Sequence, residues 1–473
     1  MKDIKNNKVK LTANILFSGI GCQERGFENS GLFELNTLHT SEINKEAVLS
    51  YAAIHCGMTN EMVNTYINYP TKQEMAQYLT DINLGYEPER DKYYDWFKLT
   101  KRKSNDLEKY WLACKLTNNL GDISRIDKLP YADFWTVSFC CQDISIAGKM
   151  QGLKKDSGTR SSLLWENIRL LNNAKQDNIL PKYLMFENVK NLVSRRFIDD
   201  FTKLINILDE IGFNTYWKII NAKECGVPQN RERVFVIAIR KDIDTGLFQF
   251  PVPFDTGVRL KDILEEAVDD KYYLSKEVQE RFTLTDNTFT KNIVGTTKPE
   301  FRTIGQRDLV YQENSIMGSL VATDYKQPKQ ILELAVLKQV GQIYGTKKEP
   351  NPQAGRIYHS DGISPTLDSC SGSNKMPKTL CFEDKKQYRI RKLTPRECFV
   401  LMGLTFEDCD KARNVGISDT HLYRQAGNGI VTNCCQLLAE HLYKAQYDNT
   451  YFCTDEKVNN RGREKRERMM KNK

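Results

Sequence analysis

A short apolar run that leads into a glycine turn and then a helix is the feature of this chain that most limits its fold. Residues 14–17 form the apolar run, Ser18-Gly19-Ile20-Gly21 forms the turn, and residues 23–27 continue as a predicted helix. Glycines let the backbone approach a ligand closely, and the first turn of a helix presents free N–H groups to it. The pattern predicts an α/β fold with a nucleotide-type cofactor at this turn, although many unrelated turns carry a single Gly-x-Gly.

Acidic residues near the next strand ends fit the same kind of site. The predicted strand at residues 35–40 ends at Glu42, and an acid about 20 residues after the glycines is the usual partner of a ribose diol. Alternatively, Glu42 is the first acid of a helix at residues 44–51. Gly121-Asp122 is a candidate third strand end, where Asp122 either accepts from an adenine amino group or caps the next turn.

A cysteine pair closes another predicted strand. The apolar run at residues 134–139 stops at Cys140-Cys141, and small and polar residues follow. Folds of the α/β class place their chemistry at strand ends, where a thiol can act as a nucleophile. The alternative is two buried core cysteines, since free cysteine is commonly interior.

A carboxylate and two arginines follow further along the chain. The predicted strand at residues 183–186 ends at Glu187, and in a parallel sheet that carboxylate can converge on the cysteine. Arg231 and Arg233 enter a predicted strand at residues 234–239. Side chains at i and i+2 of a strand point the same way, so both arginines could face an anion or a base edge. The alternative is a solvated charged turn.

The regular alternation of strands and helices ceases at about residue 248. The following residues, up to about 387, are rich in Gly, Thr, Asp and Lys and suit a second domain that grips a nucleic-acid backbone and reads bases. A dimerisation or lid domain is the alternative. Residues 391–403 are predicted to be helical, with Thr394 as the N-cap. Residues 425–430 form a second predicted glycine turn, which feeds a helix at residues 432–444 and could complete the cofactor site.

Composition excludes several classes of protein. The chain has 473 residues, a net charge of +8 and 13 cysteines without a Cys-x-x-Cys pair. A disulfide framework and a zinc site are therefore not expected, and no metal is predicted. No apolar run is long enough to cross a bilayer, and the N-terminus lacks an apolar signal core. A mild basic excess fits a polyanionic partner, and a reducing cytoplasm is the expected compartment.

Taken together and in this order, these stretches resemble the DNA (cytosine-5) methyltransferase family of bacterial and phage type. The resemblance covers most of the chain, and the ordered set is specific although each motif alone is weak. The motifs that carry it are Phe17-Ser18-Gly19-Ile20-Gly21, Cys141-Gln142 with Ser145 and Gly148, Glu187-Asn188-Val189, Gln229-Asn230-Arg231-Glu232-Arg233, residues 391–403 and residues 425–430.

The resemblance implies a Rossmann-like domain that binds S-adenosylmethionine, joined to a smaller, loop-rich target-recognition domain. Residues 1–247 would form the catalytic domain, with residues 57–118 as an insertion. Residues 248–387 would form the target-recognition domain, residues 388–450 would return to the catalytic domain, and residues 451–473 would form a disordered basic tail. The residues implied at the cofactor are Phe17, Ser18, Gly19, Ile20, Gly21, Glu42, Ile43, Asp122, Ile123, Leu163, Asn428, Gly429 and Ile430.

The resemblance also implies a mechanism on a cytosine that is flipped out of duplex DNA. Cys141 would add to C6 of the ring, Glu187 would protonate or hydrogen-bond N3, and Arg233 would hold the pyrimidine carbonyl with Arg231 in support. The methyl group would then pass from S-adenosylmethionine to C5. Further contacts to the base are implied for Phe139, Gln142 and Ser145.

This chain departs from the family pattern at three positions. Cys140 stands where the family has proline, Cys22 where glycine is usual, and Ile15 where aspartate is common. Strand alternation points adjacent cysteines to opposite sides, and the register of Gln142 selects Cys141 as the nucleophile. Loss of the proline removes a backbone constraint, which would weaken activity.

Other functions stay open at this point. A tRNA-specific branch of the same family keeps Glu-Asn-Val, so the acceptor could be RNA cytosine, although a long variable region favours DNA. A catalytically silent DNA-binding relative is a second alternative, and a nicotinamide oxidoreductase is a weaker one. The expected partner is double-stranded DNA, with a cognate restriction endonuclease or none, and a monomer in the cytoplasm of a bacterial or phage-infected cell is the expected form.

Overall fold

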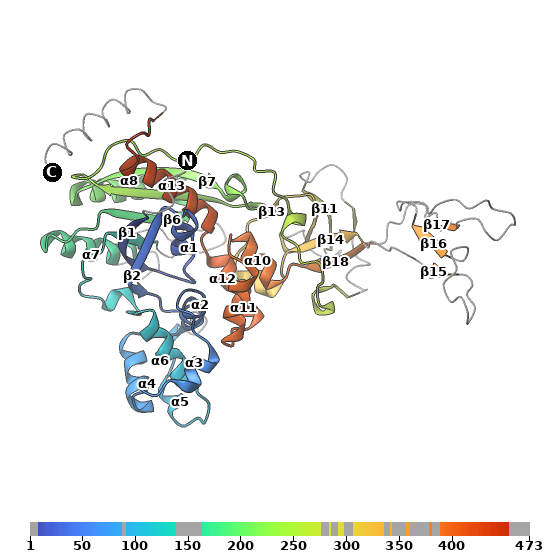
Figure 1. The fold of residues 1–473 in the computed structure, drawn as a ribbon, viewed down its shortest axis with the longest axis horizontal. Coiled ribbons are helices and arrows are strands. Elements are labelled where there is room, and N and C mark those ends of the chain that lie inside the picture. The colour runs from blue at the N-terminus through green and yellow to red at the C-terminus, as the bar shows by residue number, and fades with distance from the viewer. Residues whose placement is uncertain are drawn as a thin grey trace. The chain divides into compact units, whose positions relative to one another are not determined.

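The computed structural model describes most of the chain, in two compact units (Figure 1). The first unit comprises Met1–Glu266, Asn314–Pro328 and Thr394–Lys473, and the second comprises Ala267–Glu313 and Lys329–Leu393. Among the described helices, none combines the length and the apolar character that a membrane span requires. The described residues are 8–87, 91–138, 163–275, 283–284, 292–297, 306–334, 341–342, 356–359, 378–380 and 388–453.

The core of the first unit is a six-stranded sheet with the order β2-β1-β5-β6-β9-β7. Strands β1, β2, β5 and β6 are parallel, and β9 pairs antiparallel with β6 and β7. The carboxyl ends of the parallel strands meet at one edge, where open α/β sheets bind ligands. The predicted α/β fold is confirmed. The strands span Val9–Leu16 (β1), Phe33–Ser41 (β2), Phe134–Val137 (β5), Tyr183–Val189 (β6), Phe213–Asn221 (β7) and Glu232–Arg240 (β9).

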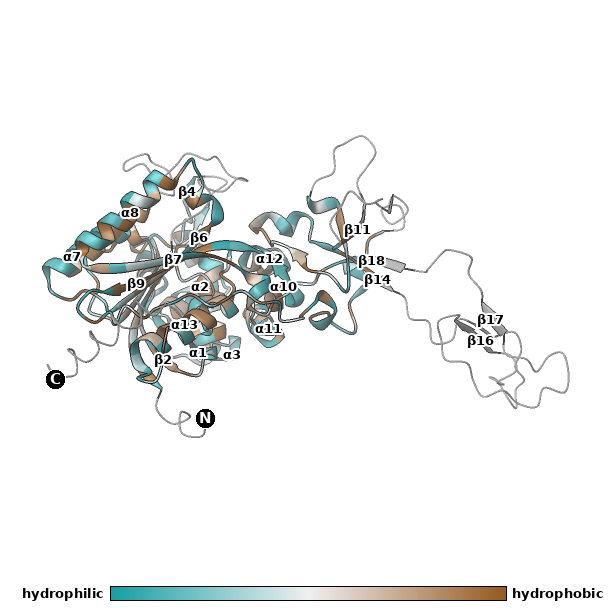
Figure 2. Ribbon diagram, turned by 90° about the horizontal axis from the view of Figure 1, so that it is seen from above, coloured by the Kyte–Doolittle hydropathy of each residue, from teal (hydrophilic) through white to brown (hydrophobic). Residues whose placement is uncertain are grey.

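Helices cover both faces of this sheet, with α7 and α8 on one face and α1 and α13 on the other (Figure 2). The pleat of β5 sends Trp135 and Val137 into the core under α7 and α8. Phe134 points the other way, and its ring lies 4.6 Å from that of Phe27 on α1. Alternate residues of one strand thus serve two cores, as expected for a sheet buried on both faces. The helices span Cys22–Asn29 (α1), Leu163–Gln176 (α7), Ile198–Ile211 (α8) and Thr432–Tyr447 (α13).

The segment predicted as an insertion forms a small helical layer beside α2 (Lys45–His55) in Figure 1. Its indole anchor is Trp96, which is fully buried and donates from Nε1 to the Leu84 carbonyl at 2.9 Å. The ring of Trp96 lies 5.1 Å from that of Tyr110 on α6. The sequence of this segment predicts two helices, at residues 72–79 and 107–116, and the structure confirms them as α4 and α6. The elements are α3 (Asn60–Thr65), α4 (Lys72–Asp81), β3 (Tyr86–Glu87), β4 (Lys92–Tyr93), α5 (Phe97–Thr100) and α6 (Asp106–Leu116).

The second unit contains a five-stranded sheet with the order β10-β11-β12-β14-β18 and a three-stranded sheet, β15-β16-β17. Val310 and Ile390 are fully buried at the centre of the larger sheet, and Leu274 and Leu332 pack against them. Arg391 belongs to β18, so the prediction that the helix begins there is wrong. Pairing of β18 with β14 keeps this residue in a strand. The strands span Thr283–Leu284 (β10), Ile293–Thr296 (β11), Leu309–Gln312 (β12), Gln330–Leu334 (β14), Gly341–Gln342 (β15), Arg356–His359 (β16), Lys378–Leu380 (β17) and Tyr388–Lys392 (β18).

The C-terminal part of the first unit continues with helices α10 (Pro395–Leu401), α11 (Phe406–Asn414) and α12 (Asp419–Asn428). The predicted N-cap at Thr394 is confirmed, because its hydroxyl accepts from the Glu397 amide at 3.2 Å and its own amide donates to the Glu397 carboxylate at 2.8 Å. The glycine turn predicted at residues 425–430 is wrong over its first part, which is helical. Close packing requires a glycine at position 427 of α12, because a Cβ there would lie 2.3 Å from the carbonyl carbon of Val321.

Two further expectations about strand ends are corrected. Glu187 lies inside β6 and not beyond it, because antiparallel pairing with β9 continues to Val189. Asp122 does not end a strand: its side chain accepts from the Ser124 amide at 3.0 Å and caps the short helical turn Ile123–Arg125. The capping alternative for Asp122 is therefore confirmed.

Candidate active site

The cysteine pair lies outside the described residues, which stop at Ser138 and resume at Leu163. The assignments of the nucleophile and of the nearby contacts to the base therefore stay predictions. What the structure describes is the edge of the sheet on either side of them. The predicted residues outside the described ranges are Phe139, Cys141, Gln142 and Ser145.

The glycine turn after β1 has the backbone of a ligand loop. Phe17 and Gly19 both have φ of +54°, and Gly21 has φ of +81°. Gly21 is required here on steric grounds as well, because a Cβ would lie 2.1 Å from the His55 ring. The turn is closed by the Gly21 amide, which donates to the Ser18 carbonyl at 2.9 Å. Helix α1 begins at the next residue, so its first amides face the turn.

Glu42 joins the glycine turn to the end of β2. One carboxylate oxygen accepts from the Gly19 amide at 3.0 Å, and the other accepts from the Asn44 amide at 2.8 Å. Burial raises the pKa of Glu42, against these backbone hydrogen bonds, which lower it. The side chain of Asn119 clamps the Glu42 backbone, accepting from its amide at 2.9 Å and donating to its carbonyl at 3.0 Å. Asn119 was not predicted, since a single asparagine in a loop carries no signal of such a role.

Asp122 lies beside this cluster and is surrounded by donors. Its carboxylate accepts from the Tyr93 hydroxyl at 2.7 Å, from the Asn83 amide at 3.2 Å and from the Ser124 hydroxyl at 2.8 Å. Burial alone would raise the pKa of Asp122, but hydrogen bonds from Tyr93, Ser124 and Asn83 bring it below its ordinary value. The neighbouring Ile123 is buried. Tyr93, from the insertion, was also missed by the sequence analysis.

The C-terminal segment approaches the same turn. Gly429 follows α12, and a Cβ on it would lie 3.4 Å from the Cys22 sulfur at the start of α1. Ile430 is buried, whereas Asn428 is exposed. Leu163, the first residue of α7, is half-buried and packs against the core between the sheet and helices α7 and α8. Of the residues predicted from the C-terminal motif, Gly429 and Ile430 therefore lie against Cys22 next to the glycine turn, Ile430 through a backbone hydrogen bond to the thiol.

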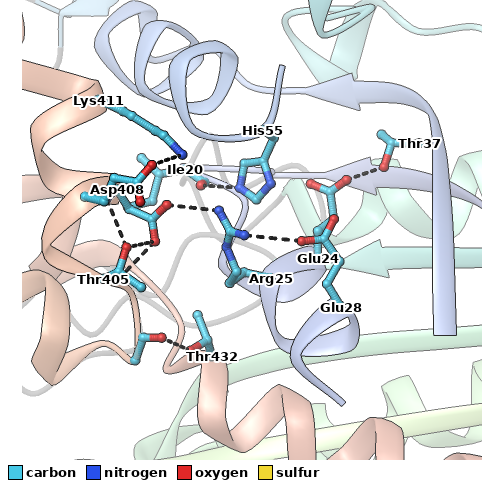
Figure 3. Close-up of polar contacts among 12 residues, drawn as sticks. Ile20, Glu24, Arg25, Glu28, Thr37, His55, Thr405, Asp408, Lys411 and Thr432 are labelled. Carbon is cyan, nitrogen blue, oxygen red and sulfur yellow. Dashed lines mark hydrogen bonds and ion pairs between the residues drawn. The ribbon is translucent and has the colours of Figure 1, made fainter. Parts of the chain in front are cut away.

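A polar network fixes α1 to the C-terminal helices (Figure 3). The Arg25 guanidinium donates to Asp408 of α11 at 3.0 Å, and Asp408 also accepts from the Thr405 hydroxyl at 2.9 Å. His55 donates from Nε2 to the Ile20 carbonyl at 3.1 Å. Burial lowers the pKa of His55 to about 4, so the imidazole is neutral at pH 7. Within the network Arg25 is paired with the Asp408 carboxylate, and His55 contributes a hydrogen bond to the turn without a charge.

The predicted catalytic residues Glu187 and Arg233 lie on the paired strands β6 and β9, and this part of the sheet is called the catalytic edge below. Glu187 is held next to β5, since its amide donates to the Ser138 hydroxyl at 3.3 Å. Arg233 Nε lies 3.1 Å from Glu187 Oε1, yet that buried oxygen accepts no hydrogen bond from the described residues. The pair is thus attracted by charge without hydrogen-bond geometry. Burial raises the pKa of Glu187, against the positive charges of Arg233 and Arg231, which lower it.

Arg231 connects the catalytic edge to the segment that packs against the glycine turn. It is 4% exposed, and its guanidinium donates to the carbonyl oxygens of Leu320 at 2.7 Å, Gly429 at 2.8 Å and Gly427 at 3.2 Å. Because Gly429 lies against Cys22, one buried guanidinium links both halves of the site. The expectation that the Arg231 side chain faces a base edge is wrong, because its guanidinium donates to backbone carbonyl oxygens.

The described part of the site shows no candidate metal centre. The described residues contain no group of three or more His, Cys, Asp or Glu side chains that could hold an ion. The cysteines within those same ranges are free thiols. The described part of the site thus consists of carboxyl groups, arginines and backbone amides.

Comparison with known proteins gives a consistent assignment. A family model described as C-5 cytosine-specific DNA methylase matches residues 100–444. The Type II methyltransferase M2.ScrFI of Lactococcus lactis subsp. cremoris is 34% identical over 91% of this chain and 98% of its own length. The orphan methyltransferase M.SPRI of Bacillus phage SPR is 26% identical over 92% and 97%, respectively. A solved structure of the Entamoeba histolytica methyltransferase EhMeth is 13% identical, covers 93% of this chain and 98% of its own, and has a TM-score of 0.49. The chain belongs to the C-5 cytosine-specific DNA methylase family.

Proposed function

We propose that this chain transfers a methyl group from S-adenosylmethionine to C5 of a flipped-out cytosine in a specific duplex DNA sequence, through a covalent adduct with Cys141. The observation that carries the proposal is the position of Glu187. Glu187 lies beside the end of β5, and in the sequence the cysteine pair follows that end closely. Its buried carboxyl lies next to Arg233, and Arg231, two residues before, donates to the Gly429 carbonyl near the glycine turn.

The chemistry explains why a thiol and a carboxyl are needed together. C5 of cytosine is a poor nucleophile, and addition of a thiolate to C6 turns C5 into the nucleophilic carbon of an enamine. S-adenosylmethionine supplies the methyl group as an electrophile and leaves as S-adenosylhomocysteine. Loss of the C5 proton and elimination of the thiolate then restore the aromatic ring. Cysteine suits both steps, because its thiolate is a strong nucleophile and a good leaving group.

Glu187 is proposed as the proton donor to N3. A carboxyl group whose pKa is raised by burial holds a proton nearer to neutral pH and can give it to a ring nitrogen as the thiolate adds. Arg233, whose Nε lies 3.1 Å from Glu187 Oε1, would orient that carboxyl and hold the pyrimidine carbonyl. Arg231 supports the site through the Gly429 backbone and does not contact the base itself.

The residues near the glycine turn fit S-adenosylmethionine. A Cβ on Gly19 would meet no atom within 4 Å, so open space adjoins the turn. Glu42 offers a carboxylate for a ribose diol, and Asp122 offers one for an amino group on an adenine ring. The proposed pocket consists of Phe17, Ser18, Gly19, Ile20, Gly21, Glu42, Ile43, Asp122, Ile123, Leu163, Asn428, Gly429 and Ile430.

Target recognition is proposed for residues 248–387. This range includes most of the second unit, whose described strands are short, and its length offers the surface that base reading in a groove requires. The net charge of +8 favours binding to the DNA backbone. We further propose a monomer that acts in the cytoplasm of a bacterial or phage-infected cell, either with a cognate restriction endonuclease or as an orphan enzyme.

Bisulfite sequencing tests the proposal directly. Plasmid DNA is recovered from cells that express this chain and from cells that express the Cys141→Ser variant. Cytosines that resist conversion at one short sequence, present with the wild-type chain and absent with the variant, would support the acceptor, the position and the nucleophile together. Complete conversion in both samples would contradict a DNA acceptor, and labelled methyl transfer to total RNA would then be measured.

A further inference from the structure

A hairpin of the insertion extends to one of the proposed cofactor residues. Strands β3 and β4 pair antiparallel, with Tyr86 opposite Tyr93. The Tyr93 hydroxyl donates to Asp122 Oδ2 at 2.7 Å, and the Tyr93 and Tyr86 ring centroids are 5.3 Å apart. Tyr93 is nevertheless 38% exposed. The hydroxyl of an accessible tyrosine is therefore hydrogen-bonded to the carboxylate that is proposed to bind the adenine amino group.

The base of this hairpin is attached to two residues of the proposed cofactor site, Ile43 and Asp122. The Gly85 amide donates to the Ile43 carbonyl at 2.7 Å, and Ile43 follows Glu42 directly. The Asp122 amide donates to the Ile82 carbonyl at 2.9 Å, and Ile82 and Gly85 both precede β3. After β4, the Tyr94 amide donates to the Gly85 carbonyl at 2.8 Å. The hairpin is thus part of the cofactor end of the first unit, and the backbone next to Tyr93 is anchored there.

The carboxylate of Asp122 has no acceptor position left. Oδ1 accepts from the Ser124 amide at 3.0 Å and from its hydroxyl at 2.8 Å. Oδ2 accepts from the Tyr93 hydroxyl and from the Asn83 amide at 3.2 Å. Since a carboxylate offers about four lone-pair sites, a further donor must displace one of these. Ser124 is held in a helical turn, whereas Tyr93 is partly exposed and can rotate away.

We propose that Tyr93 is a positioning residue for the adenosine part of the cofactor. Its hydroxyl holds Asp122 in place before binding and gives way to the adenine amino group, and its ring then forms a wall of the adenine pocket. This inference rests on the proposed function, because it takes S-adenosylmethionine as the ligand of this end of the site. It assigns to the insertion a role in cofactor recognition.

The two parts of the proposal predict opposite effects of two substitutions. Tyr93→Phe removes the competing hydroxyl and keeps the ring, so S-adenosylhomocysteine should bind about three- to ten-fold more tightly. Tyr93→Leu removes both and should weaken binding about three- to ten-fold, because aromatic contact with the base is lost. An analogue with a 6-oxo group in place of the 6-amino group should gain no affinity from Tyr93→Phe, since it cannot donate to Asp122.

Isothermal titration calorimetry on the purified full chain measures these affinities, with unfolding temperatures of the free proteins as a check on folding. Tyr131→Phe is the matched control: Tyr131 is 40% exposed and donates to Asp133 at 2.8 Å, before the start of β5 and away from the site. Equal affinity of the wild type and Tyr93→Phe, or weakening by Tyr93→Phe, would overturn the inference alone. Absence of S-adenosylhomocysteine binding by the wild-type chain would overturn the proposed cofactor and the inference with it.

Discussion

Asp122 at the cofactor end and Glu187 at the catalytic edge are both carboxyl groups beside the same edge of the sheet, but their surroundings differ. Asp122 accepts hydrogen bonds from Tyr93, Ser124 and Asn83, and these bring its pKa below the ordinary value despite burial. Glu187 Oε1 accepts none from the described residues, and burial raises its pKa against the nearby arginines. One group is kept ionised, and the other is brought nearer to holding a proton at neutral pH.

We infer that the balance between burial and donors, and not the residue type, suits each carboxyl to its proposed task. An ionised carboxylate is an acceptor and suits an amino group, as proposed for Asp122. A carboxyl with a raised pKa is a donor and suits a ring nitrogen, as proposed for Glu187. The following predictions test this contrast, from the largest expected effect to the smallest.

The catalytic edge depends first on its nucleophile. We expect Cys141→Ser to reduce methyl transfer below detection, because a serine hydroxyl is a much weaker nucleophile towards C6. Cys140→Ser should keep most of the activity. Transfer of labelled methyl groups to plasmid DNA measures both. An inactive Cys140→Ser variant beside an active Cys141→Ser variant would show that the strand register is wrong.

Glu187→Gln should lower kcat by about 10²–10⁴-fold, because an amide cannot supply the proton to N3. Cofactor affinity should change little, since Glu187 lies at the opposite end of the site from Asp122. Single-turnover methyl transfer and calorimetry separate the two effects. Glu232→Gln is the control, because Glu232 is exposed on the neighbouring strand β9 and its carboxylate pairs only with Lys190, at 2.9 Å, among the described residues. Near-normal kcat in Glu187→Gln would remove the proton-donor role.

The link between the two ends depends on Arg231. Arg231→Met should destabilise the protein by about 2–5 kcal/mol, since three buried carbonyl oxygens lose their donor. Denaturant unfolding of the free protein gives the loss of stability, with exposed Arg196→Met as the control. An Arg231→Met variant as stable as the wild type would show that the carbonyl contacts contribute nothing to the link.

Glu24 offers a third environment for the same comparison. It accepts from the hydroxyls of Thr37 and Tyr51, yet burial raises its pKa to about 7 against these hydrogen bonds. The folded protein binds this proton more tightly than the unfolded chain, whose pKa is near 4.5. The stabilisation is therefore complete below pH 4.5 and is lost as the pH rises through 7.

Glu24→Gln should remove that pH dependence. At pH 8 the variant should be more stable than the wild type by up to about 3 kcal/mol, and the advantage should shrink towards pH 5. Denaturant unfolding at several pH values measures it. Glu28→Gln, one turn along α1 at an exposed position, is the control. Parallel stability curves for the wild type and Glu24→Gln would contradict the assignment.

The smallest effect is expected at the cofactor end. Asp122→Asn should raise the KM for S-adenosylmethionine by about ten-fold, because a neutral amide accepts more weakly from an amino group and must redistribute the donors around it. Its kcat should fall much less than that of Glu187→Gln. Steady-state kinetics with varied S-adenosylmethionine measures the split. A loss confined to kcat would reverse the roles assigned to the two ends.

Several local features were predictable because their partners are close in the sequence. The glycine turn, the capping box at Thr394 and the helices of the insertion depend on residues within one or two turns of the chain. The position of Glu42 at the end of β2 followed from the strand–turn–helix pattern in the same way. The helical state of Gly427 was missed, since its glycine is needed for contact with Val321, which is distant in the sequence.

The sequence by itself determined most strands of the first unit's sheet, the family resemblance and the identity of the candidate acid. The tertiary structure alone decided what each of these groups contacts. Arg231 meets carbonyl oxygens 89 and 198 residues away, and Tyr93 of the insertion meets Asp122 29 residues away. Such contacts depend on how a sheet brings distant segments to one edge. They set the pKa of each carboxyl, and no local pattern encodes burial or the number of donors that surround a side chain.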